Sequence, residues 1–159
     1  MFPRQPSPWL VALFRAPRVL YKLGLGRLLG HRFLLLTHSG RRSGREYQTL
    51  LEVVHYQPRT RESVVVSGWG ERADWYRNIK AHPAVEVRTG TQRYAPVWRE
   101  LEPDEADAVV TEYMDQLPSF VRPLARRLGL VSRRTEADNR NEAAHLLMIG
   151  LRPRPLASD

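Results

Sequence analysis

The chain has 159 residues, a length that fits one domain of ordinary size, and its 42% hydrophobic content is enough for a folded core. It contains no cysteine, which excludes disulfide frameworks, zinc–thiolate sites and cysteine nucleophiles. The formal net charge is +8, and residues 1–45 hold nine of the 25 basic residues and no acidic one. This asymmetry suggests a polyanionic partner: a nucleic acid, an anionic membrane surface or a phosphorylated ligand.

The N-terminal segment predicts a basic amphipathic helix. Residues 8–29 carry apolar side chains at helical spacing among Arg and Lys, and Pro17 is expected to kink or divide the helix. The longest unbroken apolar run, residues 9–14, is far short of the roughly 20 residues that a transmembrane helix needs. Two interpretations stay open: residues 1–30 pack on their own domain as a helical extension, or they lie on a membrane interface.

Strand-like patterns begin after His31. Residues 32–38 predict a mostly buried strand, residues 46–56 a second one, and residues 63–68 a short third one that ends at Gly68. Side chains of a strand alternate between its faces, so one face of the second strand is expected to carry Tyr47, Thr49, Leu51, Val53 and His55. The opposite face is expected to carry Gln48, Leu50, Glu52, Val54 and Tyr56.

The middle of the chain predicts a helix followed by a hairpin. Residues 72–83 have helical spacing, with Arg72, Trp75, Tyr76 and Ile79 on one face and a stop at Pro83. Residues 84–101 predict a hairpin that turns near Gly90, in which Pro96 implies an edge or bulged position.

The last third predicts helices and one more strand. Residues 102–118 form a helix with an acidic first turn, residues 119–130 a second helix interrupted by proline, and residues 132–142 an exposed linker. Residues 143–151 form a final apolar strand.

Roughly six strands with a helix between two of them favour an α+β fold, mainly antiparallel β, in which a barrel has helices outside it. We expect a single domain over residues 1–159. Within it, residues 1–30 are the helical extension, 31–150 the barrel core with its helices, and 151–159 a tail.

The loop between the first two predicted strands is unusually rich in positive charge. Residues 39–45 read Ser-Gly-Arg-Arg-Ser-Gly-Arg. Arginine forks pair bidentately with phosphate oxygens, serine hydroxyls donate hydrogen bonds, and glycines let backbone N–H groups approach closely. The loop is not a Walker loop, which has four residues between its glycines and ends in Gly-Lys-Ser/Thr. Phosphate binding and an exposed basic turn both stay open.

A second cluster lies between the third strand and the following helix. Ser67, Gly68, Trp69 and Gly70 precede a helix with two adjacent aromatic residues, Trp75 and Tyr76. The strand end offers backbone hydrogen bonds and the aromatic side chains offer a wall, so the cluster suits a planar ring system. For Trp75 alone, anchoring the helix on the barrel is the favoured interpretation.

Other kinds of site have little support. The five histidines include no i,i+4 pair and the carboxylates are not clustered, so we expect no metal site. No Gly-x-Ser-x-Gly elbow indicates a hydrolase. We expect no nucleic-acid binding either, because the basic residues are not interleaved with exposed stacking aromatics.

Three stretches in this order resemble the deazaflavin-dependent nitroreductase and quinone reductase family: LLLTHSGRRSGREYQT, VVVSGWG and DWYRNIKAHPAVEVRTG. The resemblance runs from about Phe33 to Trp98, and the combination is specific where each piece alone is not. It implies a split β-barrel that binds the reduced deazaflavin coenzyme F-420, whose phosphate and polyglutamyl tail are anionic.

The resemblance also implies positions for the coenzyme. The residues that match the phosphate cradle are Arg41, Arg42, Ser43 and Gly44, and Arg45 extends the patch. Ser67 and Gly68 match the strand end beside the deazaflavin ring, and the helix that flanks the ring is matched by Trp75, Tyr76 and Asn78. Many members carry Lys-Gly-Gly after the serine, whereas Gly68-Trp69-Gly70 stands here, so that Trp69 narrows or covers the ring pocket. This departure leaves FMN as an alternative cofactor.

The activity implied is hydride transfer from the reduced coenzyme to a quinone, nitro compound or similar electron-poor acceptor. Ser67 is expected to hydrogen-bond near the ring, and Tyr76 and Tyr113 are candidate proton donors. A lipophilic quinone would suit a cytoplasmic protein that contacts the inner face of the membrane through residues 8–29. Split barrels often pair through strand faces, which leaves a homodimer open. The alternative function is a non-catalytic carrier of a flavin, deazaflavin or lipid on the same barrel.

Overall fold

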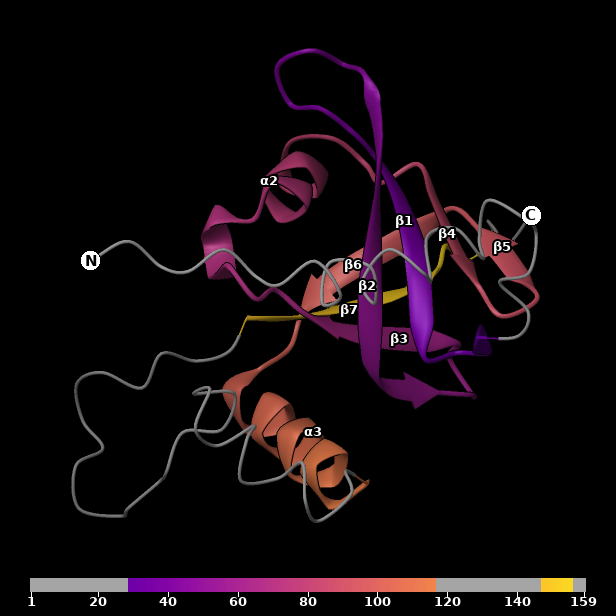
Figure 1. Cartoon of the computed structure of the whole chain (residues 1–159), viewed down its shortest axis with the longest axis vertical. Coiled ribbons are helices and arrows are strands. Elements are labelled where there is room, and N and C mark those ends of the chain that lie inside the picture. The colour runs from indigo at the N-terminus through magenta and orange to yellow at the C-terminus, as the bar shows by residue number, and fades with distance from the viewer. Residues whose placement is uncertain (1–28, 117–146, 156–159) are drawn as a thin grey trace, which may run out of the picture.

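The computed structural model describes residues 29–116 and 147–155 (Figure 1). The helices expected within residues 1–28 and 119–130 and the linker at 132–142 lie outside this part of the chain. The elements follow in the order β1 (Phe33–Ser39), β2 (Glu46–Gln57), β3 (Glu62–Val66), the 3-10 turn η2 (Gly70–Arg72), α2 (Asp74–Ala81), β4 (Glu86–Thr89), β5 (Gln92–Tyr94), β6 (Pro96–Glu100), α3 (Pro103–Gln116) and β7 (Met148–Pro153).

The strands form one antiparallel sheet of seven in the order β5-β4-β1-β2-β3-β7-β6. The two ends of this order, β5 and β6, are consecutive in the chain and separated only by Ala95. The sheet therefore curls into a nearly closed barrel, which confirms the expected fold class.

The barrel has one strand more than expected, because the second arm of the predicted hairpin is divided at Ala95. The first piece, β5, pairs with β4, and the second piece, β6, pairs with β7 on the other side of the barrel. Pro96 begins β6, which lies at an edge of the sheet. Proline has no N–H to donate to a ladder, so the first residue of an edge strand tolerates it.

The long strand β2 is shared by the two halves of the barrel. It pairs with β1 and then with β3, and its register shifts between Val53 and His55. The expected strict alternation is wrong at this point, because Val54 and His55 both face α3. Val54 packs against the apolar cluster that contains Val109, and His55 Nδ1 lies 3.1 Å from Glu112 Oε2. A bulge adds one residue and increases the twist, so it helps the strand to curve around the barrel.

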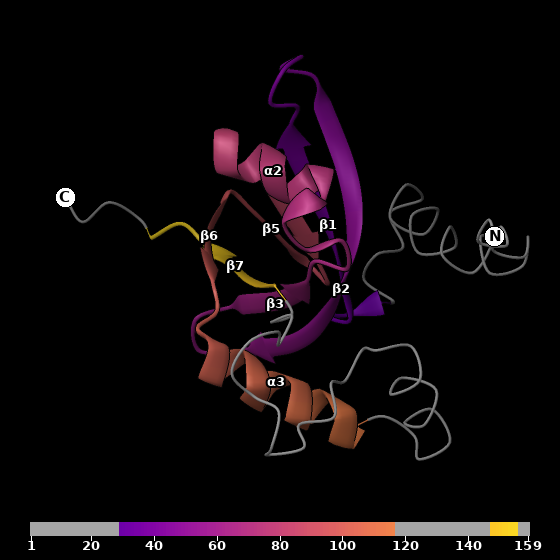
Figure 2. The same ribbon diagram turned by 90° about the vertical axis from the view of Figure 1, so that its left-hand side faces the viewer.

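The two helices of the described part cover opposite ends of the barrel (Figure 2). The buried side chains of α2 include Trp75, Tyr76 and Ile79, as its spacing predicted, and they join the main core inside the barrel. Arg72, expected on the same face, instead lies in η2, which has no buried residue. Ala106 and Val109 of α3 pack on a second, smaller core. No helix within residues 29–116 is long and apolar enough to cross a membrane.

The last strand corrects the C-terminal boundary. The final strand was expected to end at residue 151, with residues 152 and 153 in a tail, but β7 extends to Pro153. Leu151 is fully buried and pairs with Ser63 on one side and Trp98 on the other, and Pro153 pairs with Pro96. These pairings join β3 to β6 and bring the second edge strand into the barrel.

Candidate functional site

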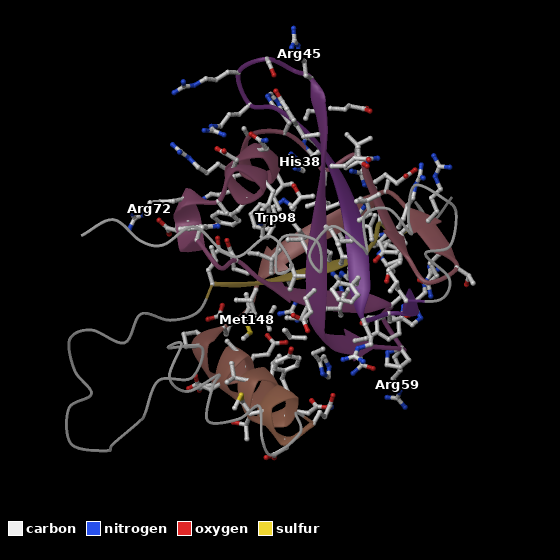
Figure 3. The ribbon with its side chains drawn as sticks, viewed as in Figure 1. His38, Arg45, Arg59, Arg72, Trp98 and Met148 are labelled. Atoms are coloured by element: carbon white, nitrogen blue, oxygen red, sulfur yellow. The ribbon has the colours of Figure 1, made fainter. Side chains whose placement is uncertain are left out.

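A cavity of about 480 Å³ lies between α2 and the loop that connects β1 to β2, which we call the arginine loop (residues 39–45). Its lining comprises Gly40, Arg41, Arg42 and Ser43 of the loop, His38 of β1, Tyr47, Gln48 and Thr49 of β2, and Asp74, Trp75 and Asn78 of α2. Figure 3 shows His38 at the base of this region and Arg45 at the tip of the hairpin. The fold thus places the arginine loop beside α2, the helix that was predicted to lie next to a planar ring system.

Two glycines give the arginine loop its shape. The N–H of Gly40 donates to the Arg45 carbonyl and the N–H of Gly44 donates to the Gly40 carbonyl, both at 2.8 Å. Gly44 has a φ of 67°, in the left-handed region that favours glycine. A Cβ on Gly40 would lie 2.7 Å from Ser43 Oγ and 2.8 Å from the Tyr47 ring. Gly44 therefore permits the tight turn of the backbone, and Gly40 leaves room for the side chains of Ser43 and Tyr47.

Arg41 is held against α2 by three hydrogen bonds. Its backbone N–H donates to Asn78 Oδ1 at 3.1 Å, and its Nη1 donates to Asn78 Oδ1 at 3.1 Å and to Asp74 Oδ1 at 3.0 Å. The Asp74 side chain is 80% exposed, so water screens much of its charge. With Arg41 and Arg42 against this one carboxylate, the lining keeps an excess of positive charge.

A buried polar chain continues from Asn78 into the barrel. Asn78 Nδ2 lies 3.0 Å from His38 Nδ1, and His38 Nε2 lies 2.9 Å from Thr49 Oγ1. Because Asn78 Oδ1 accepts the bonds from Arg41, its Nδ2 must donate to His38 Nδ1, which assigns the His38 proton to Nε2. Burial lowers the pKa of His38, and the nearby Asp74 carboxylate opposes this shift. His38 is therefore a neutral acceptor at neutral pH.

This lowered pKa of His38 predicts a loss of stability in mild acid. Below the unfolded value of 6.5, the unfolded chain binds the His38 proton more readily than the folded chain does. The free energy of unfolding should fall between about pH 7 and 5, by at most about 1.4 kcal/mol per pH unit from this group. Urea unfolding at both pH values measures the loss. His38→Asn, which cannot titrate, should flatten the dependence, and an unchanged slope would contradict the assignment.

Ser67 and its neighbours form a turn outside the cavity lining. Ser67 is buried, and its hydroxyl donates to the Gly70 carbonyl at 2.7 Å while the N–H of Gly70 donates back to the Ser67 carbonyl at 2.9 Å. Trp69 is 83% exposed. The Ser67 hydroxyl thus holds the turn, and the indole of Trp69 is presented to solvent rather than to the core.

The two candidate proton donors are not brought to the cavity. Tyr76 is 1% exposed and its hydroxyl donates to Glu100; burial first, and then this carboxylate, raise its pKa. The Tyr113 hydroxyl donates to Glu52 Oε1 at 2.7 Å and lines a different cavity of about 530 Å³ between β2 and α3. Burial, followed by Glu52, raises the pKa of Tyr113 to about 12. Arg45, at the hairpin tip, does not line the arginine-loop cavity either.

Six lining residues were not among the predicted cofactor contacts: His38, Gly40, Tyr47, Gln48, Thr49 and Asp74. A signal for three of them was present. His38 directly precedes the arginine loop, and strict alternation placed Tyr47 and Thr49 on one face of the strand that follows it. In the described ranges, no group of three or more His, Cys, Asp or Glu residues is arranged to hold a metal ion.

Comparisons with known proteins give the family and the fold of the chain. The model of the family "F420H(2)-dependent quinone reductase" matches residues 14–123. A solved structure described as an F420-H2 dependent reductase (FDR-A) is 22% identical with a TM-score of 0.50, over 77% of this chain and 95% of that one. A solved domain-swapped dimer is 22% identical with a TM-score of 0.51, over 92% of this chain and 99% of that one.

A search of curated proteins found no significant match. The two structural similarities establish the barrel fold, whereas the family match extends over the arginine loop, α2 and α3. Because that match covers more than half of the sequence, the chain belongs to the F420H(2)-dependent quinone reductase family, whose cofactor is F-420.

Proposed function

We propose that this chain binds the phosphate of reduced F-420 in the arginine-loop cavity and reduces a quinone, nitro compound or similar electron-poor acceptor. The observation that carries the proposal is the cavity itself, where Arg41, Arg42 and Ser43 meet α2. When bound, the coenzyme supplies the hydride, and the protein supplies binding, orientation and exclusion of water.

The donors of the cavity fit a phosphate. The bonds from Arg41 to α2 engage Nη1, and we assign the Nε and Nη2 edge to the phosphate oxygens. Ser43 Oγ accepts the N–H of Arg45 at 3.3 Å and lies 3.5 Å from the Tyr47 hydroxyl, so its own proton can be donated. Arg42, which is exposed, adds a second guanidinium to the lining. Two guanidinium groups and one hydroxyl match an anion better than a neutral ligand.

The deazaflavin ring is assigned to the side of the cavity where α2 begins. Trp75 lines the cavity there, and the turn from Ser67 to Gly70 precedes the helix. Since the Ser67 hydroxyl is bonded to Gly70, we assign the contacts from this turn to backbone groups and to the exposed Trp69 indole, which can shield the ring from water.

Two parts of the proposal rest on sequence. Residues 8–29 are assigned to peripheral contact with an anionic membrane, which would deliver a lipophilic quinone. Co-sedimentation of the full-length chain with anionic vesicles tests this assignment, and a chain that stays in the supernatant contradicts it.

The second part is the pairing of two copies into a homodimer. Sedimentation equilibrium tests this pairing, and a monomer would contradict it.

Turnover tests the proposed reaction. Full-length protein mixed with reduced F-420 and a soluble quinone should oxidise the coenzyme continuously, at a rate that saturates with both reactants. Reactions without protein give the background rate. Binding of the coenzyme without steady-state oxidation, across both quinone and nitro acceptors, would contradict the reductase and favour a non-catalytic carrier.

A further inference from the structure

The arginine loop is connected to the barrel interior through two buried side chains: Asn78 bonds Arg41, and His38 bonds Asn78. We infer that His38 is a positioning residue: its unprotonated Nδ1 accepts a hydrogen bond from Asn78 and thereby keeps the Asn78 oxygen directed at Arg41. The inference rests on the proposed function, because it assumes that Arg41 binds the phosphate.

The direction of each bond follows from the donors present. An asparagine amide has one oxygen acceptor and one nitrogen that only donates. If the Asn78 amide turned over, its nitrogen would face the backbone N–H and Nη1 of Arg41, and three donors would meet without an acceptor. An acceptor on the opposite side strengthens this preference, and His38 Nδ1 lies there, 3.0 Å from Asn78 Nδ2.

Burial makes this orientation costly to lose. His38 is 3% exposed and Asn78 is 4% exposed, so water cannot readily replace a lost partner. The far side of the imidazole is also fixed, because its Nε2–H donates to Thr49 Oγ1 at 2.9 Å. The chain of bonds therefore ties β1, β2, α2 and the arginine loop together around the cavity.

Protonation of His38 should reverse the bond. A protonated Nδ1 is a donor, so it would bond the Asn78 oxygen instead of the nitrogen, and the bonds from Arg41 to Asn78 would be lost. Among the described residues, the charged or titratable groups beside the imidazole are Asp74 of α2, Arg41 beyond Asn78, and Tyr47 of β2, whose ring centroid is 6.1 Å away. Simple attraction predicts the opposite outcome, because an added positive charge near the cavity would strengthen anion binding. The sign of the pH effect therefore separates the two accounts.

The test compares three variants of the full-length chain by titration with F-420 at about pH 7.5 and 5.5. His38→Leu removes the acceptor and should weaken binding about tenfold at the higher pH. His38→Asn places an amide oxygen near the position of Nδ1 and should bind nearly as the unmodified chain does, with little pH dependence. The unmodified chain and the control His55→Asn, altered at the far cavity, should both bind more weakly at the lower pH.

Three results would overturn the inference. The first is full affinity in His38→Leu, and the second is equal weakening in His38→Leu and His38→Asn. The third is binding by the unmodified chain that is no weaker at the lower pH. If no form binds F-420, the proposed function fails instead.

Heteronuclear NMR of the free protein gives a readout that does not depend on the coenzyme: at neutral pH, His38 should carry its proton on Nε2 alone. A proton on Nδ1 in the unmodified chain would also overturn the inference. The variant Asn78→Asp removes the amide donor and should raise the pKa of His38.

Discussion

Replacing both Arg41 and Arg42 by alanine is expected to weaken F-420 binding by at least about 100-fold, since each charge-assisted hydrogen bond contributes about 1.5–3 kcal/mol. Both side chains line the cavity, and Arg41 is already oriented by Asn78 and Asp74 before any ligand arrives. A guanidinium that is already held in place loses little conformational entropy when the ligand binds, so its removal should cost nearly the whole free energy of its hydrogen bonds. Fluorescence titration with the coenzyme measures the change.

The matched control removes the same two charges elsewhere. Arg59 lies in the turn between β2 and β3, far from Arg45 in Figure 3, and Arg154 follows β7; both are exposed and neither lines the cavity. The double variant Arg59→Ala/Arg154→Ala should bind F-420 within a few-fold of the unmodified chain, because distant exposed charges are screened by salt. Equal weakening of both double variants would show general attraction to a basic protein and would contradict a defined phosphate site.

Arg99→Ala is expected to lower the free energy of unfolding by about 3 kcal/mol, the lower end of the range for breaking a buried ion pair, because Glu62 is buried while the Arg99 side chain is 40% exposed. Arg99 of β6 donates to both oxygens of Glu62 of β3, at 2.6 and 3.0 Å, and the Glu62 side chain is only 8% exposed. The same guanidinium donates to both oxygens of Glu105 of α3, at 2.6 and 2.7 Å. Without Arg99, a buried carboxylate loses its partner at the edge strand that completes the barrel.

Arg93→Ala is the control for this change. Arg93 also bonds a carboxylate, Glu86, but its side chain is 67% exposed and Glu86 keeps Arg88 as a partner. Exposed ion pairs contribute little, so this variant should lose less than about 1 kcal/mol. Urea unfolding of both proteins at neutral pH gives the comparison. A loss at Arg99 that does not exceed the loss at Arg93 would mean that Glu62 is not held by this pair.

Local patterns were sufficient to predict the part of the molecule that carries the arginine loop. A run of leucines, a turn with two glycines and a long alternating segment predicted β1, the loop and β2, and apolar spacing ended by Pro83 predicted α2. The formation of each of these elements depends on residues that are close in the sequence, where backbone preference and the spacing of apolar side chains dominate.

The features that were missed depend on contacts between distant segments. Nothing near Val53 marks the bulge, which follows from how β2 must curve between two partner strands. The break at Ala95 appears only when β6 is paired with β7, more than 50 residues later. His38 and Asn78 are 40 positions apart, so their bond could not be derived from spacing in the sequence. For the same reason, the sequence could not show that Tyr113 points to Glu52 rather than to the arginine loop.

The claim that the arginine loop holds F-420 is tested most directly by titrating the full-length chain with the coenzyme in the presence and absence of excess FMN. The predicted result is saturable binding, with a dissociation constant on the order of micromolar, that FMN does not displace and that the Arg41→Ala/Arg42→Ala variant loses. Displacement by FMN, or binding that is indifferent to these two arginines, would contradict the claim.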